Sequence, residues 1–222
     1  MVSTTREHFL SDSASHQITD QVPAAVAPIA ELMSSYPAPW ALCGAVDAWL
    51  GRQTRDHGDV DIIAFVQDQR SLLEHLRDWQ LVAHDARVSG DTPEPWRGRP
   101  LELPAHIHAR LDTGEDLPAR GPLLPDQGFS LDIQLNDRRG GEWVLSQRPR
   151  MSIALPNSVH RPTAGLPTVV PEVLLFFKAL DLRRRDRLDF LALLPHLRGE
   201  QRDWLRDAIS LVGHPWLSQL SP

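Results

Sequence analysis

The sequence is short of several residue types, and each shortage excludes a class of protein. Cys43 is the only cysteine among 222 residues, so the chain forms no internal disulfide and no zinc site with several cysteines. The longest apolar run, near residues 169–177, is interrupted by Pro171 and Glu172. It is shorter than the roughly 20 apolar residues that cross a membrane. These shortages indicate a soluble protein, expected in the cytoplasm, with no membrane partner.

Basic residues are in the minority. Lys and Arg number 23 against 29 Asp and Glu, which gives a net charge of −6 with His neutral. Proteins that bind nucleic acid without sequence preference need a basic surface, so this charge argues against a nucleic-acid partner. A local basic pocket for a small anion is still compatible with it.

Hydrophobic periodicity predicts a mixed first part and a helical last part. Strands are expected at 40–43, 59–66, 80–84, 101–103, 106–111, 130–135 and 142–145. Helices are expected at 20–34, 45–50, 68–79, 171–180, 185–196 and 201–212. We therefore divide the chain into a loosely ordered start (1–19), an α/β region (20–165) and a C-terminal helical region (166–222). The fold class is α/β or, with segregated helices, α+β.

Two aspartates at the start of a predicted strand are the most informative chemical feature. Asp59 and Asp61 are two residues apart, so their side chains would lie on the same face of the strand. Their repulsion would be relieved by a divalent cation, and carboxylate oxygens are ligands that Mg²⁺ prefers. Asp132, in the middle of the predicted strand 130–135, would be a third carboxylate if the two strands are neighbours.

The residues before these aspartates suit a phosphate. Gly44 follows a short apolar strand and would let a phosphate approach the backbone at the start of a helix, where free N–H groups gather. Arg52 and Arg55 supply positive charge in the loop that leads to Asp59. Strand, turn, helix, loop and strand thus form one compact unit that carries charge of both signs.

The order of these motifs resembles a known family. Leu42-Cys-Gly-Ala-Val-Asp47, Gly51-Arg52, Arg55-Asp-His57 and Asp59-Val-Asp-Ile62 are similar to the signature of the nucleotidyltransferase superfamily. The similarity is to the branch of small aminoglycoside and lincosamide nucleotidyltransferases and their uncharacterised relatives. Residues 170–178, 185–186 and 189–195 resemble the helical segment of the same branch.

The resemblance implies a fold, a reaction and a set of site residues. The fold would be a mixed β-sheet flanked by helices, with a C-terminal helical region beside the cleft. The enzyme would transfer a nucleoside monophosphate from an NTP, expected to be ATP, to a hydroxyl of a small acceptor, with two Mg²⁺ ions and release of pyrophosphate. Asp59 and Asp61 match the metal-binding pair, and Asp132 matches the third carboxylate by its strand context, with Asp85 and Asp112 as alternatives. The residues expected at the nucleotide are Gly44, Ala45, Asp47, Arg52, His57, Lys178 and Arg185.

Other interpretations stay open beside this one. The main rival is a non-catalytic nucleotidyltransferase-like protein that binds a nucleotide or a protein partner, as in a toxin–antitoxin pair. A phosphohydrolase is disfavoured because no His/Asp hydrolase spacing is present. His106 and His108 would share a strand face but lack a clear third ligand, so we expect ordinary surface residues there. Trp96, in a proline-rich segment, is a candidate for covering an acceptor.

Overall fold

The computed structural model of the chain describes residues 27–44, 60–85, 93–111, 130–147, 150–160, 166–180 and 184–220. In this part of the chain, strands assemble in the order β4-β3-β5-β6-β2-β1-β10-β9, and β7 joins through β6 and pairs with β8. Their bounds are β1 Ala41–Cys43, β2 Val60–Phe65, β3 Trp79–Asp85, β4 Glu94–Pro95, β5 Ala105–Leu111, β6 Ser130–Arg139, β7 Glu142–Gln147, β8 Arg150–Ala154, β9 Val159–His160 and β10 Thr168–Val169.

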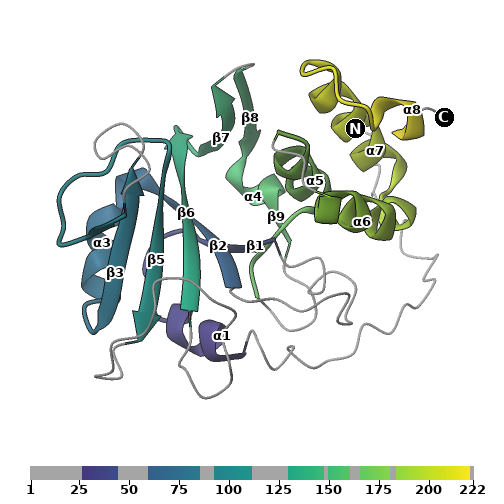
Figure 1. The fold of residues 1–222 in the computed structure, drawn as a ribbon. Coiled ribbons are helices and arrows are strands. Elements are labelled where there is room, and N and C mark those ends of the chain that lie inside the picture. Colours follow the sequence, from purple (N-terminus) through teal and green to yellow (C-terminus); the bar gives the residue numbers. More distant parts are fainter. Residues whose placement is uncertain are drawn as a thin grey trace, which may run out of the picture.

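The sheet is mixed. Strand β2 runs parallel to β6, and β1 runs parallel to β10, whereas the other paired strands are antiparallel. The helices are α1 Ala27–Met33, η1 Val66–Asp68, α3 Gln69–His75, α4 Leu155–Ser158, α5 Pro171–Leu180, α6 Arg184–Leu193, η2 Leu194–His196, α7 Gly199–Ser210 and α8 Leu217–Leu220. Figure 1 shows α5 to α8 gathered on one side of the molecule, away from β3 and α3.

Alternation along the strands produces two hydrophobic cores. On β2, Ile62 and Ala64 belong to a core with residues of α1 and α3. Ile63 and Phe65 belong to a second core with residues of α5, α6 and α7. Because successive side chains of a strand point to opposite faces, the two cores lie on opposite faces of the sheet.

The second face changes character between neighbouring strands. Ile63 and Phe65 of β2 are buried there against the C-terminal helices. The residues of β6 paired with them are Gln134 and Asn136, which are polar and half-buried. Toward β5 and β3 this face is polar as well, with His108 and His84 half-buried. A boundary between apolar and polar surface therefore runs between β2 and β6.

Much of the predicted order is confirmed. The strands at β2, β3, β5, β6 and β7 and the three long C-terminal helices agree with the periodicity within a few residues. The strand expected at 101–103 is wrong, because the backbone N–H of Leu101 donates to Oε1 of Gln69 (2.7 Å) and not to a neighbouring strand. The expected helix 45–50 and residues 1–26 lie outside the described residues. None of the described helices combines the length and apolar character needed to span a membrane.

Candidate active site

Asp61 and Asp132 lie directly opposite each other at the boundary on the second face. They are paired residues of the parallel strands β2 and β6, which the pairing from Val60 to Phe65 fixes in register. Neighbouring strands are about 4.8 Å apart, and side chains of paired residues lie on the same face. The structure thus brings together two of the three predicted carboxylates. Asp59, the other member of the expected pair, lies outside the described residues.

The two oxygens of Asp132 have different surroundings. Its side chain is 16% exposed, and Oδ2 lies 3.7 Å from Nε2 of His108 on β5. Oδ1 is buried and accepts no hydrogen bond within the described part of the chain. A buried carboxylate oxygen without a partner costs free energy unless a cation or a proton compensates it. Oxygen donors of Asp61 and Asp132, with one oxygen lacking a protein partner, fit a hard divalent cation such as Mg²⁺.

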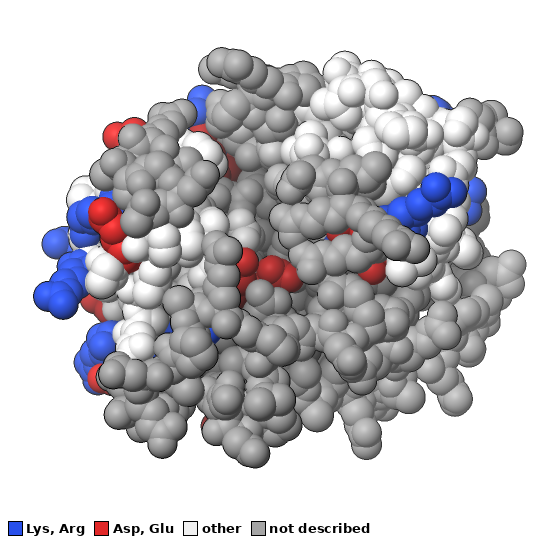
Figure 2. Space-filling view, in the orientation of Figure 1, with Lys and Arg blue, Asp and Glu red and all other residues white. Residues whose placement is uncertain are grey.

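Figure 2 shows where acidic residues gather on this side of the molecule. Acidic side chains are visible in the middle of the face, between the strands on the left and the C-terminal helices on the right. The chain has a net charge of −6, so this cluster adds to an acidic background and is not balanced by a general excess of bases. Cations would be attracted to such a site more strongly than nucleotides alone.

Gly44 leaves room for the Asp61 carboxylate. It follows β1 and has a φ of +81°, a conformation that residues with a side chain rarely adopt. A Cβ at Gly44 would overlap Oδ2 of Asp61 and come within 3.1 Å of its Cβ. The glycine at this position is therefore required both by the backbone conformation and by the carboxylate beside it.

We expect Gly44→Ala to disturb both the fold and the site, and the effect on the site to be what distinguishes it from a glycine with positive φ elsewhere. The positive φ costs about 1–3 kcal/mol for a residue with a side chain, and the new methyl group must displace Asp61. Divalent-cation binding should therefore weaken by at least about tenfold, since a displacement of one ligand costs about 1.4 kcal/mol or more. Titration calorimetry with Mg²⁺ or Mn²⁺ and a thermal melt would measure the two effects. Gly140→Ala is the matched control, because Gly140 also has positive φ but no atom within 4 Å of the added Cβ.

Cys43 is a structural neighbour of the two carboxylates and not a nucleophile. It pairs with Asp61 across β1 and β2. Burial, and then the negative charge of Asp61, raises the pKa of its thiol to about 12. The thiol thus stays protonated at neutral pH. Helix α5, which carries Lys178, packs in the second core with Cys43 and Ile63, so it covers the face of the sheet to which Asp61 also belongs.

Lys178 is engaged by two buried acids. Its Nζ lies 2.7 Å from Oδ2 of Asp189 and 3.2 Å from Oδ1 of Asp186. The Lys178 side chain is 11% exposed, and the two aspartates are 6% exposed or less. It is also the only lysine of the chain. Because two negative charges already face this ammonium, binding of a phosphate to Lys178 stays a prediction and would have to compete with Asp186 and Asp189.

Most of the remaining predicted site residues belong to segments that the structure does not describe. Four of them lie outside the described residues, namely Ala45, Asp47, Arg52 and His57. Arg185 lies in α6, and its side chain is outside the described part. Of the alternatives for the third carboxylate, Asp112 is outside as well, and Asp85 occupies the last position of β3. Asp132 is thus the described candidate that directly faces Asp61.

Trp96 and a cavity of the structure both lie away from the carboxylates. Trp96 does not cover a cleft but is buried in the core formed with α1 and α3, where its Nε1 donates to the carbonyl of Arg99 (2.8 Å). A cavity of about 820 Å³ is lined by Tyr36, Trp40, Phe65 and other residues. Its lining includes Ile63 and Phe65 of β2, but not Gly44, Asp61 or Asp132. The cavity is therefore separate from the carboxylate pair.

The histidines on the polar half of the face form a cluster that sequence reasoning missed. His106 and His108 do share a strand face, but they are not isolated surface residues. His84 of β3 is paired with His106 and completes a group of three half-buried imidazoles. The alternation in residues 81–84 shows which face of its strand His84 occupies. It does not show that β3 pairs with β5, and this pairing is what brings His84 to His106.

Comparison with solved structures defines the fold. The chain matches the crystal structure of the lincosamide antibiotic adenylyltransferase LnuA with lincomycin bound, with a TM-score of 0.50 and 18% identity. The match covers 78% of this chain and 96% of that one. A second match is the crystal structure of ANT(2'')-Ia in complex with adenylyl-2''-tobramycin, with a TM-score of 0.50 and 15% identity over 83% of this chain and 94% of that one.

The fold is thus the nucleotidyltransferase-like fold that the motifs predict, a mixed sheet with helices and a C-terminal helical region. No family model matches the sequence, and no curated protein matches it either. At these identities the likeness shows the fold alone. The chemistry of this chain has to be argued from its own residues.

Proposed function

We propose that the protein is a Mg²⁺-dependent nucleotidyltransferase that transfers a nucleoside monophosphate from an NTP to a hydroxyl of a small acceptor. The observation that carries the proposal is the pairing of Asp61 with Asp132 across β2 and β6, with Oδ1 of Asp132 buried and lacking a hydrogen-bond partner among the described residues. This pair stands in a fold shared with antibiotic nucleotidyltransferases. Two carboxylates held in register provide oxygen ligands for the divalent cation that the reaction needs.

The chemistry assigns different roles to the two carboxylates. The acceptor oxygen forms a bond to the α-phosphorus, and the bond from that phosphorus to pyrophosphate breaks. Asp132 is proposed to take the proton of the acceptor hydroxyl, a role supported by the oxygen that has no hydrogen-bond partner among the described residues. Asp61, adjacent to Gly44, would orient the triphosphate through the cation that it binds. Asp59, two residues earlier in the sequence, is proposed as the other ligand.

Mg²⁺ would be held by the carboxylates of Asp59, Asp61 and Asp132. When bound, Mg²⁺ neutralises charge on the phosphates and on the departing pyrophosphate. The chain itself contributes the register of β2 and β6, which fixes the distance between Asp61 and Asp132 before the substrate arrives.

ATP and a hydroxylated small molecule are the proposed substrates. LnuA is named an adenylyltransferase, and the ANT(2'')-Ia structure contains an adenylyl product, which supports ATP as the donor. The same structures contain lincomycin and a tobramycin derivative, so aminoglycosides and lincosamides are the first acceptors to try. The acidic face of Figure 2 is compatible with cationic acceptors of this kind.

Pyrophosphate release tests the proposal. The full chain would be incubated with Mg²⁺, each of the four common NTPs and a panel of aminoglycosides, lincosamides and simpler polyols. The expected result is pyrophosphate release that depends on one NTP and one acceptor class, with a product heavier by one nucleotidyl group in mass spectrometry. Binding of Mg·NTP with no pyrophosphate from any acceptor would instead support the non-catalytic nucleotide-binding interpretation.

A further inference from the structure

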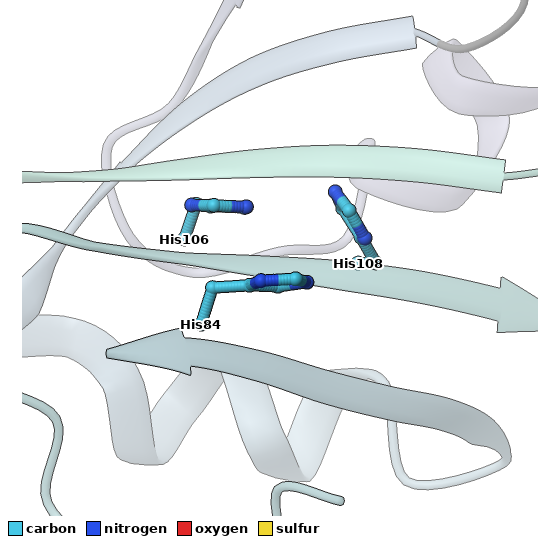
Figure 3. Close-up of side chains that lie close together, drawn as sticks. All are labelled: His84, His106 and His108. Atoms are coloured by element: carbon cyan, nitrogen blue, oxygen red, sulfur yellow. The ribbon is translucent and has the colours of Figure 1, made fainter. Parts of the chain in front are cut away.

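Three histidines converge next to the carboxylate pair. His84 lies on β3, and His106 and His108 lie two residues apart on β5. His84 is the paired residue of His106, so all three side chains lie on the same face of the sheet. Figure 3 shows the three rings gathered above the two strands, with those of His84 and His106 nearly parallel. One ring nitrogen of each lies within 4.8 Å of one from each of the others.

The three imidazole rings lie close to one another, but they are not part of a packed aromatic core. The His84 and His106 rings are stacked with centroids 4.3 Å apart and an angle of 8° between planes. The His108 centroid is 4.6 Å from that of His84 and 5.0 Å from that of His106. All three residues are half-buried. Imidazole nitrogens are common ligands for metal ions, and three of them stand together here.

An oxygen donor stands beside the three nitrogens. Oδ2 of Asp132 is 3.7 Å from Nε2 of His108, which faces it across β5 and β6. Two ligands of one tetrahedral zinc ion, with bonds of about 2.0–2.1 Å, are about 3.3 Å apart. The His108–Asp132 separation is close to this value. The wider separations among the imidazoles, up to 4.8 Å, require rotation of the side chains, which would open the stack of His84 on His106.

We propose that His84, His106 and His108 form a second metal site, selective for a borderline transition ion such as Zn²⁺, with Asp132 or water as the fourth ligand. Imidazole nitrogen favours Zn²⁺, Co²⁺ and Ni²⁺, whereas Mg²⁺ favours oxygen ligands. Its nitrogen ligands distinguish this site from the carboxylate pair, although Asp132 borders both. The proposal does not depend on nucleotidyl transfer, because its three nitrogen ligands take no part in that reaction.

Metal binding by the full chain, produced without a polyhistidine tag, tests the site. Co²⁺ is the spectroscopic probe, since tetrahedral Co²⁺ absorbs strongly in the visible range, and Zn²⁺ is then titrated in competition. We expect one tetrahedral Co²⁺ per chain, recognised by its visible absorption and displaced by Zn²⁺. His84→Asn, His106→Asn and His108→Asn should each weaken binding by about 100-fold or more, because loss of a ligand exceeds the 10- to 100-fold cost of losing an outer-shell partner.

Two control variants show whether binding is specific to the three histidines. His196→Asn removes an exposed histidine of η2 and should leave Co²⁺ binding unchanged. Asp61→Asn alters the carboxylate pair and should also leave tetrahedral Co²⁺ binding unchanged. Binding at the histidines can therefore be tested whether or not the nucleotidyltransferase proposal holds. A cooperative melt without Zn²⁺ shows that each cluster variant is folded, and the loss of the Zn²⁺-dependent rise seen for the wild type shows that it lacks the site.

The proposal is overturned by any of three results. The first is that the wild type binds neither Co²⁺ nor Zn²⁺ at one ion per chain. The second is that the three cluster variants bind Co²⁺ as tightly as His196→Asn, and the third is that Asp61→Asn removes Co²⁺ binding while the cluster variants keep it.

Discussion

Asp61→Asn and Asp132→Asn should each lower the rate of nucleotidyl transfer by a factor of about 100 to 10,000, the usual contribution of a general base or a metal-activating group. The amide is the same size as the carboxylate but carries no charge. Asp132→Asn therefore cannot take up the acceptor proton, and Asp61→Asn binds a divalent cation weakly. The pyrophosphate assay with the preferred NTP and acceptor measures the effect.

The same substitutions should not destabilise the protein. Asp61 and Asp132 are like charges directly opposite each other on neighbouring strands, an arrangement that is unfavourable in the absence of a cation. The melting temperature of the metal-free variants should therefore equal or exceed that of the wild type. Large loss of activity without loss of stability is the result expected of a functional site and not of a structural one.

Asp137→Asn is the matched control for these variants. Asp137 lies five residues further along β6 and contacts Gln67 and Arg139 at the far end of the strand. Its replacement should leave nucleotidyl transfer within about twofold of the wild type, as for surface substitutions away from the site. An equal loss of activity in Asp137→Asn, or full activity in Asp61→Asn, would contradict the assignment of the pair.

Lys178→Met should destabilise the protein by about 3–5 kcal/mol, the usual cost of removing one partner of a buried ion pair. The methionine fills a similar volume, but Asp186 and Asp189 lose the ammonium that neutralises them while buried at 6% and 3% exposure. For a chain of this size the expected loss of melting temperature is about 6–20 °C. Chemical denaturation and a thermal melt measure both quantities.

A combined variant distinguishes lost charge pairing from lost packing. Replacing all three groups, with Lys178→Met, Asp186→Asn and Asp189→Asn, removes the buried charges together. Because uncharged replacements of a buried ionic cluster are often close to neutral, this variant should recover most of the stability lost by Lys178→Met. If Lys178→Met melts like the wild type, or if the combined variant is the least stable, the loss does not come from leaving the charges of Asp186 and Asp189 without the ammonium.

The sequence predicted most of the elements because their periodicity is local. The alternation of Leu131, Ile133 and Leu135 with polar residues identified β6, and Pro171 marked the first turn of α5. Strand β8 was missed. It has five residues, and the alternation of Met151 with Ile153 is too short to stand out in a segment that contains only short elements. Strands β9 and β10, with two residues each, are too short for any periodic signal.

The site was predictable only in part, because it depends on which strands are neighbours. Family resemblance singled out Asp61 and Asp132, which are 71 positions apart in the chain, but only the pairing of β2 with β6 brings them together. The histidine cluster was missed for the same reason, since His84 meets His106 through the pairing of β3 with β5. Lys178 was expected at a phosphate, and the two aspartates one helix later were not recognised as its partners.

Binding of Mg·ATP to the wild type and to the Asp61→Asn/Asp132→Asn double variant is the most direct test of the carboxylate pair. Titration calorimetry in the presence and absence of Mg²⁺ separates the nucleotide from the cation. We predict Mg²⁺-dependent binding of the nucleotide by the wild type and a loss of at least about 100-fold in the double variant. Equal affinity of the two proteins for Mg·ATP would contradict the proposed role of the pair.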